Sequence, residues 1–308
     1  MPQRVFITGI AGLVGQNLVP YLKQSFTITG ADKHTHNLGV LRSLHPELSL
    51  LQADCAEPGT WEDELASCDA LVILHAQIGG LFEGEFIRNN ITATRRVLDA
   101  ARRGTVKHIV HVSSSVINSA ACDFYTETKK QQESLVQDCG IPNVILRPTL
   151  MFGWFDRKHL GWLKRFLEKA PLFPVPGSGK YLRQPLFAGD FSAIIASCLR
   201  SRIDGLYNIS GLDNIHYIDL IREIRDVAGL RTPVVRVPYS LFWLMLAAYG
   251  IFDRDPPFTT HQLKALVTPD IFEVMDWPTR FGVTATPLRQ ALETTFNDPR
   301  YSHVLLEF

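Results

Sequence analysis

Two side chains able to move a proton lie four residues apart in the segment FYTETKK. At that spacing Tyr125 and Lys129 would share one face of a helix, so both could reach one bound ligand. A tyrosine near its reference pKa of about 10 is a poor base at neutral pH, but a neighbouring ammonium favours the phenolate and lowers that pKa. The pair therefore predicts general acid/base chemistry, although the same spacing also arises by chance on many helices.

Three consecutive serines precede this pair, at the end of the strand-like run HIVHV. Ser113, Ser114 and Ser115 would then lie at the carboxyl edge of a parallel sheet, where sheets of this kind bind their ligands. One hydroxyl there could hydrogen-bond a substrate oxygen. For at least two of the three serines we favour the simpler interpretation of a polar cap on the strand end.

A glycine-rich turn follows the first strand-like run, in VFITGIAGLVGQNLV. Gly9, Gly12 and Gly15 stand where the chain turns from a strand into a helix, with the spacing GxxGxxG rather than GxGxxG. Glycine lets the backbone turn sharply and approach a pyrophosphate, and the helix start offers unpaired N–H groups to the phosphates. Asp32 ends the next strand-like run, near the distance at which a carboxylate meets the adenosine ribose. Together these features predict a dinucleotide site.

The same aspartate informs the choice of cofactor. A carboxylate pairs with the ribose 2′-hydroxyl of NAD and repels the 2′-phosphate of NADP. Asp32 is followed by Lys33 and His34 rather than by arginine. The sequence therefore favours NAD and leaves NADP as the weaker alternative.

Alternating strand and helix patterns surround these residues over the first two thirds of the chain. The predicted strands are Val5–Thr8, Thr27–Ala31, Leu48–Gln52, Ala70–Leu74, His108–Val112 and Val144–Leu146. Amphipathic patterns between them predict helices at Leu13–Lys23, Phe86–Arg102 and Glu127–Cys139. Such alternation predicts an α/β fold, a doubly wound parallel sheet of the Rossmann type with helices on both faces.

The pattern changes after Leu150. The Pro- and Gly-rich run from Pro171 to Gly179 predicts a surface loop, followed by a strand at Leu206–Ile209 and a helix at Tyr217–Ala228. We expect a cofactor-binding domain over residues 1–150, with later returns of the chain to the sheet at about 180–210. Residues 151–308 would mainly form a smaller, interleaved substrate lobe.

Composition excludes several classes of protein. The 308 residues hold 31 Lys and Arg against 31 Asp and Glu, so no net charge draws the chain to nucleic acid. The five cysteines form no CxxC pair, which predicts reduced thiols in the cytoplasm and no metal site. The longest apolar run, Leu241–Phe252, is too short to span a bilayer, and the N-terminus has no signal-peptide pattern.

Further motifs follow in a recognisable order. They are Gln52–Cys55, Leu74–Gln77, Asn90 with Ala93 and Thr94 behind it, Leu146–Thr149, and Arg183 followed by Asp190. With the glycine turn and the Tyr–Lys pair, they resemble the extended short-chain dehydrogenase/reductase superfamily, in its NAD-dependent epimerase/dehydratase family. The resemblance runs from about Arg4 to Ala196 and more weakly to the C-terminus.

The resemblance implies a role for each matching residue. It places the catalytic triad on Ser115, with Ser114 as the next choice, Tyr125 and Lys129, and it gives Lys129 the nicotinamide ribose as well. The implied cofactor-binding residues are Gly9, Ala11, Gly12, Leu13, Val14, Gly15, Asp32, Lys33, Asp54, Cys55, His75, Ala76, Gln77, Asn90, Ser113, Tyr125, Lys129 and Pro148. The implied substrate contacts are Ser114, Asn118, Thr149 and Arg183, the last at the diphosphate of a nucleotide sugar.

Two departures from the family pattern keep other functions open. The stretch between Ser115 and Tyr125 is shorter than in typical sugar epimerases, and the apolar run PYSLFWLMLAAYGIF resembles the tail of sterol-type and flavonoid-type members. Our first hypothesis is an NAD-dependent epimerase or oxidoreductase of a nucleotide sugar. The second is a dehydrogenase of a sterol-like or other apolar alcohol, and the third is a non-catalytic dinucleotide-binding subunit.

Relatives of this kind often form dimers. The helical segments Phe86–Arg102 and Tyr125–Cys139 could pair with their copies in a four-helix interface. The expected partners are therefore a small-molecule substrate and a second copy of the chain.

Overall fold

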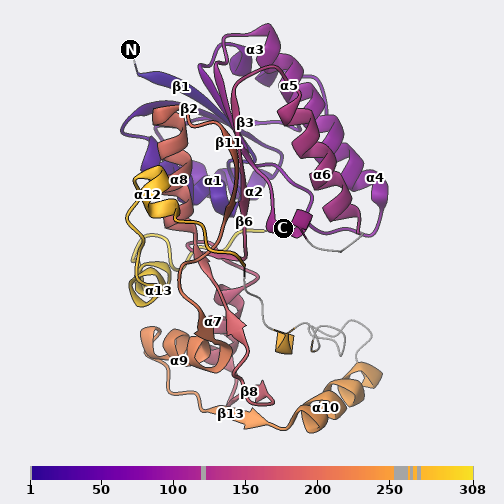
Figure 1. Cartoon of the computed structure of the whole chain (residues 1–308), viewed down its shortest axis with the longest axis vertical. Coiled ribbons are helices and arrows are strands. Elements are labelled where there is room, and N and C mark those ends of the chain that lie inside the picture. Colours follow the sequence, from indigo (N-terminus) through magenta and orange to yellow (C-terminus); the bar gives the residue numbers. More distant parts are fainter. Residues whose placement is uncertain (1, 119–122, 253–262, 264–265, 269–271, 308) are drawn as a thin grey trace.

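A parallel β-sheet forms one end of the molecule (Figure 1). The computed structural model describes residues 2–118, 123–252, 263, 266–268 and 272–307. In this part of the chain the sheet has seven strands in the order β11-β6-β5-β4-β1-β2-β3, all parallel. Their bounds are β1 Gln3–Thr8, β2 Phe26–Asp32, β3 Ser49–Gln52, β4 Ala70–Ile73, β5 His108–Val112, β6 Asn143–Pro148 and β11 Gly205–Ile209.

The order of the strands reverses between β1 and β4. From β1 the chain proceeds to β2 and β3 on one side, and from β4 to β5, β6 and β11 on the other. A doubly wound sheet binds its ligand outside the carboxyl ends of the strands at such a switch point. The predicted doubly wound α/β fold is confirmed, and the switch point lies beside the glycine turn.

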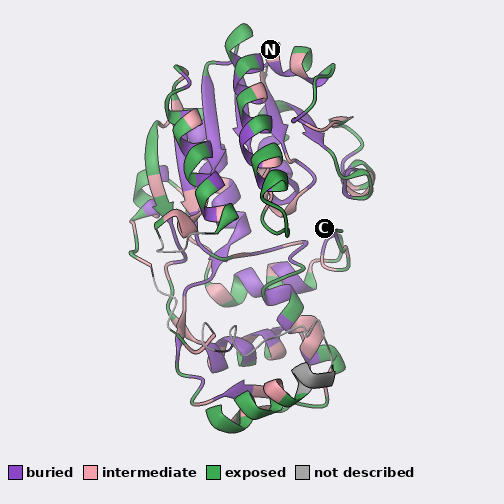
Figure 2. Cartoon of the chain, turned by 90° about the vertical axis from the view of Figure 1, so that its right-hand side faces the viewer, coloured by how far each residue is buried: buried purple, intermediate pink, exposed green. Residues whose placement is uncertain are grey.

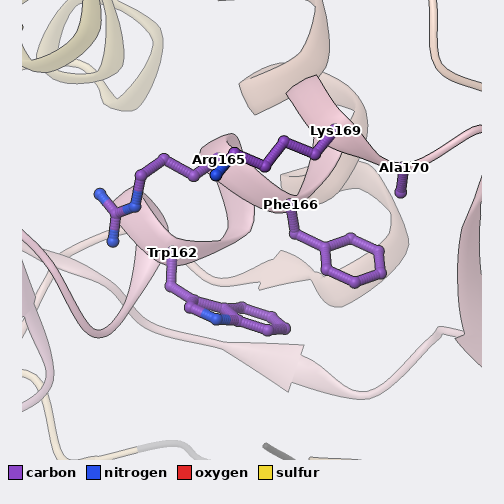
Figure 3. Close-up of a pocket in the computed structure, with 5 residues that line it drawn as sticks. All are labelled: Trp162, Arg165, Phe166, Lys169 and Ala170. Atoms are coloured by element: carbon purple, nitrogen blue, oxygen red, sulfur yellow. The ribbon is translucent and has the colours of Figure 1, made fainter.

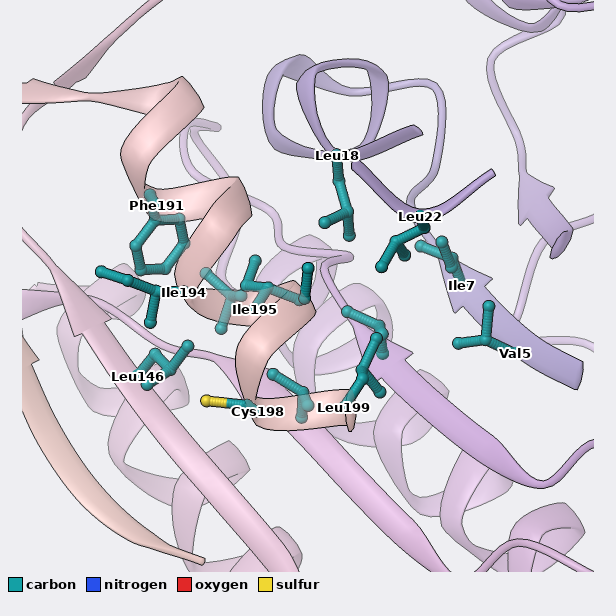
Figure 4. Close-up of a cluster of buried hydrophobic side chains, with 14 of the residues drawn as sticks. Val5, Ile7, Leu18, Leu22, Leu146, Phe191, Ile194, Ile195, Cys198 and Leu199 are labelled. Carbon is teal, nitrogen blue, oxygen red and sulfur yellow. The ribbon is translucent and has the colours of Figure 1, made fainter. Parts of the chain in front are cut away.

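Helices cover both faces of the sheet and bury them in two separate apolar clusters. One face carries α1 (Leu13–Leu22), α2 (Thr35–Leu44) and α8 (Ala188–Ser201), and the other carries α3 (Trp61–Ala66), α5 (Ala93–Arg103) and α6 (Phe124–Gln137). Figure 4 shows the first cluster, where Ile195 of α8 is turned toward Leu18 and Leu22 of α1. Because both faces are covered, every residue of β4 and β5 is buried, including His108 and His111 of β5.

The helix predicted at Phe86–Arg102 is interrupted. The chain forms α4 (Glu83–Phe86), a π-helical turn η1 (Ile87–Thr92), and then α5. A π-turn widens the helix by one residue and is common near functional sites. It holds Asn90, whose buried side chain is hydrogen-bonded to two other elements, so tertiary contacts decided this local geometry.

A smaller lobe follows β6. Its helices are α7 (Leu160–Lys169), α9 (Tyr217–Val227), α10 (Tyr239–Phe252), α12 (Trp277–Phe281) and α13 (Leu288–Asn297). Its short strands pair as β7 (Met151–Phe152) with β10 (Leu186–Phe187), β9 (Leu182–Arg183) with β12 (Ile215–His216), and β8 (Phe173–Pro176) with β13 (Val234–Val237).

The loop predicted at Pro171–Gly179 is partly wrong, because it contains β8. This strand is one of only two in its small sheet among the described residues, so its prolines cost few ladder hydrogen bonds. Phe173 and Val175 point into the apolar core of the lobe, and burial of these side chains decides the conformation.

The lobe and the sheet are interleaved. After the lobe has begun, the chain returns to the sheet through α8 and β11. Trp277 of α12 also lies in the core beside the sheet, where its indole N–H donates to the Ser210 carbonyl (2.9 Å). No helix in the described residues is both long and apolar enough to cross a bilayer.

Candidate active site

The three glycines of the first turn are required for different reasons. Gly9 has φ +69°, and a Cβ there would lie 2.8 Å from the His75 backbone nitrogen. A Cβ on Gly15 would lie 2.2 Å from the Ile10 carbonyl oxygen. Gly12 begins α1 with an ordinary φ of −77°, and its closest neighbour would be the Gly9 oxygen at 3.4 Å. The protein's own packing therefore requires glycine at positions 9 and 15. At position 12 the protein has room for a side chain, so only a bound molecule would require glycine there.

The helix start beside Gly12 is suited to an anion. Leu13 and Val14 are the first two residues of α1, so their N–H groups have no carbonyl partner within the helix. The first turn holds no acidic side chain and the N-cap makes no side-chain hydrogen bond. The dipole and the N–H groups there can meet a pyrophosphate, which fits a dinucleotide.

Asp32 lies at the end of β2, next to this turn. Its carboxylate accepts hydrogen bonds from the N–H groups of Ala11 and His34, both at 3.0 Å. Each bond uses a different oxygen, which leaves each oxygen with capacity to accept from a ribose hydroxyl. Lys33 is exposed beside it. Asp32 thus holds the glycine turn against β2 and fits the predicted ribose contact.

The segment after β3 is held by an ion pair that the sequence did not suggest. Arg88 of the π-turn donates to Asp54 (2.7 Å) and to Glu57 (2.8 Å). Burial alone would raise the pKa of Asp54, but the bonds from Arg88 and from the Ala56 N–H lower it below its usual value. Cys55 is buried, which raises the pKa of its thiol to about 12, so it stays protonated. It could serve the predicted cofactor contact only as a small neutral side chain.

A buried chain of hydrogen bonds runs from the first strand to Lys129. His75 is bonded through Nδ1 to Thr8 Oγ1 (2.7 Å) and through Nε2 to Thr94 Oγ1 (3.0 Å). Gln132 donates to Thr94 Oγ1 (2.8 Å) and accepts from the Lys129 ammonium (2.5 Å). This chain ties together strand β1, the loop after β4 and helices α5 and α6.

Burial sets the charge along this chain. It lowers the pKa of His75 to about 3, with the Lys129 ammonium as the second cause, so the imidazole is neutral. It also lowers the pKa of Lys129 to about 7, although the nearby Glu133 carboxylate opposes this. Lys129 also donates to the Val112 carbonyl (3.0 Å). Because an ammonium has three N–H donors and two are used here, one remains for another acceptor.

Asn90 fixes the loop that follows β4. Its amide oxygen accepts from the Gln77 N–H (2.6 Å), and its NH₂ group donates to the Gln77 carbonyl and to Thr128 Oγ1 (2.9 Å). The loop segment with His75, Ala76 and Gln77 is therefore held against α6 at Thr128, the residue directly before Lys129. Asn90 acts here on the loop backbone, so its cofactor role would be indirect.

Tyr125 stands in the first turn of α6. The helix begins at Phe124, earlier than predicted, because Asp123 caps it and accepts from the Thr126 N–H (2.7 Å). The Tyr125 hydroxyl is hydrogen-bonded to Ser114; this bond lowers the tyrosine pKa, but burial outweighs it and the pKa lies above its ordinary value. Ser115, our first choice from the sequence, instead begins the 3₁₀ turn η2 (Ser115–Asn118). The geometry favours Ser114 as the serine that acts with Tyr125.

Two buried hydroxyls at the carboxyl edge have no partner among the described residues. They are Ser113 Oγ at the end of β5 and Thr149 Oγ1 just after Pro148, at the end of β6. A buried hydroxyl without a hydrogen bond is costly, so such groups often mark a bound molecule. Ser113 was predicted to contact the cofactor and Thr149 the substrate, and their orphaned oxygens fit a ligand between the two strands.

Two predicted substrate residues have protein partners instead. Asn118 accepts from Arg147 (3.1 Å) and donates to Asn208 (3.0 Å), at the edge formed by β6 and β11. Arg183 lies over the rings of Tyr181 and Tyr217, and its guanidinium donates to the carbonyls of Leu182, Leu266 and Thr268. For both side chains substrate contact stays a prediction.

A hollow in the smaller lobe is separate from these residues. It lies on α7 and is lined by Trp162, Arg165, Phe166, Lys169 and Ala170 (Figure 3). None of the predicted catalytic, cofactor or substrate residues contributes to it.

Comparison with known proteins places the chain in a family. Residues 5–210 match the model of the NAD dependent epimerase/dehydratase family. The chain belongs to this family. The match covers more than half of the chain and includes the glycine turn, Asp32 and the Tyr125–Lys129 pair. The family description names NAD, which confirms the cofactor predicted from the turn and Asp32.

Individual relatives are distant and differ in activity. The UDP-glucose 4-epimerase of Vibrio cholerae is 23% identical in an alignment 288 positions long, which covers 82% of this chain and 85% of the relative. The ceramide reductase of Caulobacter vibrioides is 26% identical over 246 residues, covering 76% and 73%. The solved UDP-glucuronic acid 4-epimerase of Bacillus cereus, in complex with NAD, is 19% identical with a TM-score of 0.74. The match covers 96% of this chain and 97% of the solved chain. At this identity the structural likeness supports the fold alone.

Sequence reasoning missed several supporting residues. Thr8, Gln132 and Arg88 all touch predicted site residues, but none belongs to a motif that was singled out. Gln132 had a detectable signal, because it lies three residues after Lys129 on the same face of a helix. Thr8 and Arg88 had none, since their partners are far away in sequence.

Proposed function

We propose that this chain is an NAD-dependent epimerase, or a closely related oxidoreductase, of a nucleotide-activated sugar that passes through a keto intermediate. The observation that carries the proposal is the hydrogen-bonded pair of Tyr125 and Ser114 at the carboxyl edge of the sheet, with Lys129 one helical turn further on. This is an acid/base group with an orienting hydroxyl and a nearby cation. Membership of the epimerase/dehydratase family adds support.

In this proposal Tyr125 takes the proton from a sugar hydroxyl and later returns it. Ser114 is its hydrogen-bond partner, which stabilises the phenolate and also orients the reacting oxygen. Burial holds the Tyr125 pKa above its ordinary value in the absence of cofactor, so positive charge from bound NAD, together with Lys129, would have to lower it for Tyr125 to act as a base. A bound NAD would supply the redox chemistry, as hydride acceptor from the sugar carbon and as hydride donor to the other face of the keto sugar.

The residues around the switch point would bind the cofactor. The N–H groups of Leu13 and Val14 and the bare backbone of Gly12 would meet the pyrophosphate, and Asp32 the adenosine ribose. Ser113 Oγ and the remaining N–H of Lys129 would meet the nicotinamide half. The nucleotide-sugar class rests on relatives such as the Vibrio and Bacillus 4-epimerases. A diphosphate contact from Arg183 is part of this proposal, although its guanidinium is bonded to backbone carbonyls in the structure.

A second candidate is oxidation or reduction of an apolar alcohol. Two observations favour it: the relative named ceramide reductase, and the exposed apolar helix α10 in the substrate lobe. It uses the same Tyr125, Ser114 and Lys129. The two candidates differ in substrate and in whether NADH accumulates.

The experiment follows anomeric signals by proton NMR and NADH by absorbance, with NAD and a panel of UDP-, GDP- and dTDP-hexoses. A new anomeric signal without net NADH supports the epimerase. Unchanged sugars, together with NADH formation from hydrophobic alcohols, would replace it with the second candidate. A protein that binds NAD but turns over nothing in either panel would instead be a binding subunit.

Variants test the residues. Tyr125→Phe should reduce kcat by about a hundredfold to ten-thousandfold while NAD affinity is kept. Ser114→Ala should reduce kcat more than its matched control Ser115→Ala, and the reverse order would return the role to Ser115. Full turnover in Tyr125→Phe would refute the proposed mechanism.

The predicted homodimer belongs to this proposal as well. The outward positions of α5 and α6 carry charged groups, among them the pairs Arg102–Asp99 and Lys130–Glu127. A four-helix interface there would be polar and sensitive to salt. Sedimentation analysis at low and high salt would test it.

A further inference from the structure

Helix α10 is an apolar element in an exposed position. From Val237 to Phe252 the sequence contains no charged residue. Leu241, Trp243, Leu244 and Met245 are nevertheless exposed, by 46 to 59% of their surface. Figure 2 shows the helix at the lower end of the molecule with much of its ribbon in the exposed colour. Monomeric proteins rarely leave such a continuous apolar surface in water unless it binds something.

The rest of the described chain does not cover this helix. No described side chain of α10 belongs to any of the four apolar clusters, although α9 and β13 before it contribute to the cluster of the lobe. The neighbouring α7, α9 and β8 pack on one another instead. A helix that is apolar all round is normally buried, so α10 lacks the surroundings that its composition demands.

The exposed side chains extend around most of the helix. At about 100° per residue, Trp243, Leu244, Leu241 and Met245 cover an arc of about 200°. A helix that packs on one protein surface buries a stripe of about 100°. A single protein partner, including a second copy of this chain, would therefore leave part of the apolar arc in water, whereas a helix lying in the boundary region of a bilayer can bury more of the arc.

Length and flanking residues indicate how the helix would lie. Fourteen residues make a helix of about 21 Å, shorter than the hydrocarbon core of about 30 Å, so α10 cannot span a bilayer. Trp243 and Tyr239 are exposed aromatics of the kind enriched at the membrane–water boundary. Arg231 and Arg236 precede the helix, are exposed, and form no ion pair within the described residues.

From these features we propose that α10 is a membrane-surface helix that docks the substrate lobe onto a bilayer containing anionic lipid. The apolar arc would enter the boundary between headgroups and acyl chains, and Arg231 and Arg236 would contact acidic headgroups. The attachment is peripheral, and it is independent of whether the substrate is a nucleotide sugar or an apolar alcohol. Helix α6, which carries Tyr125, lies in the other part of the molecule, beside the large sheet (Figure 1).

Flotation with vesicles tests this. The full-length protein is mixed with vesicles of phosphatidylcholine, with or without phosphatidylglycerol, and the fraction that floats is measured. The wild type should float with the anionic vesicles and less with the neutral ones. A double variant, Trp243→Glu with Leu244→Glu, should lose binding by at least about tenfold, because two charges would have to enter the apolar boundary.

The control is Leu305→Glu, which places a glutamate at another exposed leucine, outside the lobe helix. It should float as the wild type does. Melting temperature and NAD binding of every variant show whether it is folded. A second variant, Arg231→Gln with Arg236→Gln, should keep weak binding but lose the preference for anionic vesicles.

Two outcomes would overturn the proposal. One is a wild type that floats with neither kind of vesicle. The other is a wild type that self-associates in sedimentation analysis while the α10 double variant is monomeric and vesicle binding is absent, because α10 would then be an interface between copies. Neither result bears on the acid/base chemistry, which is tested by Tyr125→Phe.

Discussion

Gly12 and Gly15 stand in the same turn, and alanine at each should have opposite consequences. At Gly15 the new Cβ would lie 2.2 Å from the Ile10 carbonyl oxygen, a backbone atom that cannot move aside cheaply. Overpacking of this kind costs about 3 kcal/mol or more of the free energy of unfolding. Gly15→Ala should therefore unfold at distinctly lower urea concentration, with or without NAD.

Gly12→Ala should fold as well as the wild type. Its φ of −77° suits alanine, and the nearest atom to the new Cβ would be the Gly9 oxygen at 3.4 Å. Reduced entropy of the unfolded chain contributes about 0.4–1 kcal/mol, and the poorer N-cap offsets a similar amount. The net change in stability should be within about 0.5 kcal/mol.

Binding separates the two variants further. The methyl group of Gly12→Ala would occupy the space where a pyrophosphate approaches the backbone, so the Kd for NAD should rise at least about tenfold, or about 1.4 kcal/mol. Urea unfolding without cofactor and calorimetric titration with NAD give both quantities. A Gly12→Ala protein with normal NAD affinity would refute the placement of the pyrophosphate. Unchanged stability in Gly15→Ala would refute the packing of the turn.

Three further predictions concern charge. Burial lowers the pKa of Lys129 to about 7, whereas an ordinary lysine has a pKa of 10.5. Between pH 7 and pH 10.5 the unfolded chain therefore holds more protons than the folded one, so the free energy of unfolding rises with pH. Lys129→Met should remove this rise, which amounts to up to about 1.4 kcal/mol of unfolding free energy per pH unit and can be measured by urea unfolding at several pH values. Lys130 is the exposed neighbour of Lys129, and Lys130→Met should keep the rise. Asp32→Asn removes the charge that repels a 2′-phosphate, so the ratio of NADP to NAD affinity should rise about tenfold in titration calorimetry, and an unchanged ratio would contradict the ribose contact. Arg88→Ala should raise the pKa of Asp54 toward its ordinary value, followed by NMR titration, at a cost of less than about 1 kcal/mol because both pairs are partly exposed.

The sequence by itself determined the succession of strands and helices along the chain, the doubly wound class of the sheet, and the sheet edge at which its motifs lie. The spacing of apolar residues and the residues typical of turns are local signals. For this reason the bounds of β5, His108–Val112, were predicted to the residue, and those of α1 to within one residue. The glycine turn, Asp32 and the Tyr125–Lys129 pair are local in the same sense. Each motif lies where one strand ends or one helix begins, and the geometry of a parallel sheet then brings them to one edge.

Contacts between distant segments were decided only by the tertiary structure. The choice of Ser114 over Ser115 depends on how η2 meets α6, and the buried chain from Thr8 to Lys129 joins residues 121 positions apart. The strand β8 forms in a Pro-rich run because β13 lies beside it, and the π-turn forms because Asn90 bonds to Gln77 and Thr128. Composition likewise predicts that α10 is apolar, but its exposure follows from the packing of the other elements, because burial depends on what the rest of the chain places nearby.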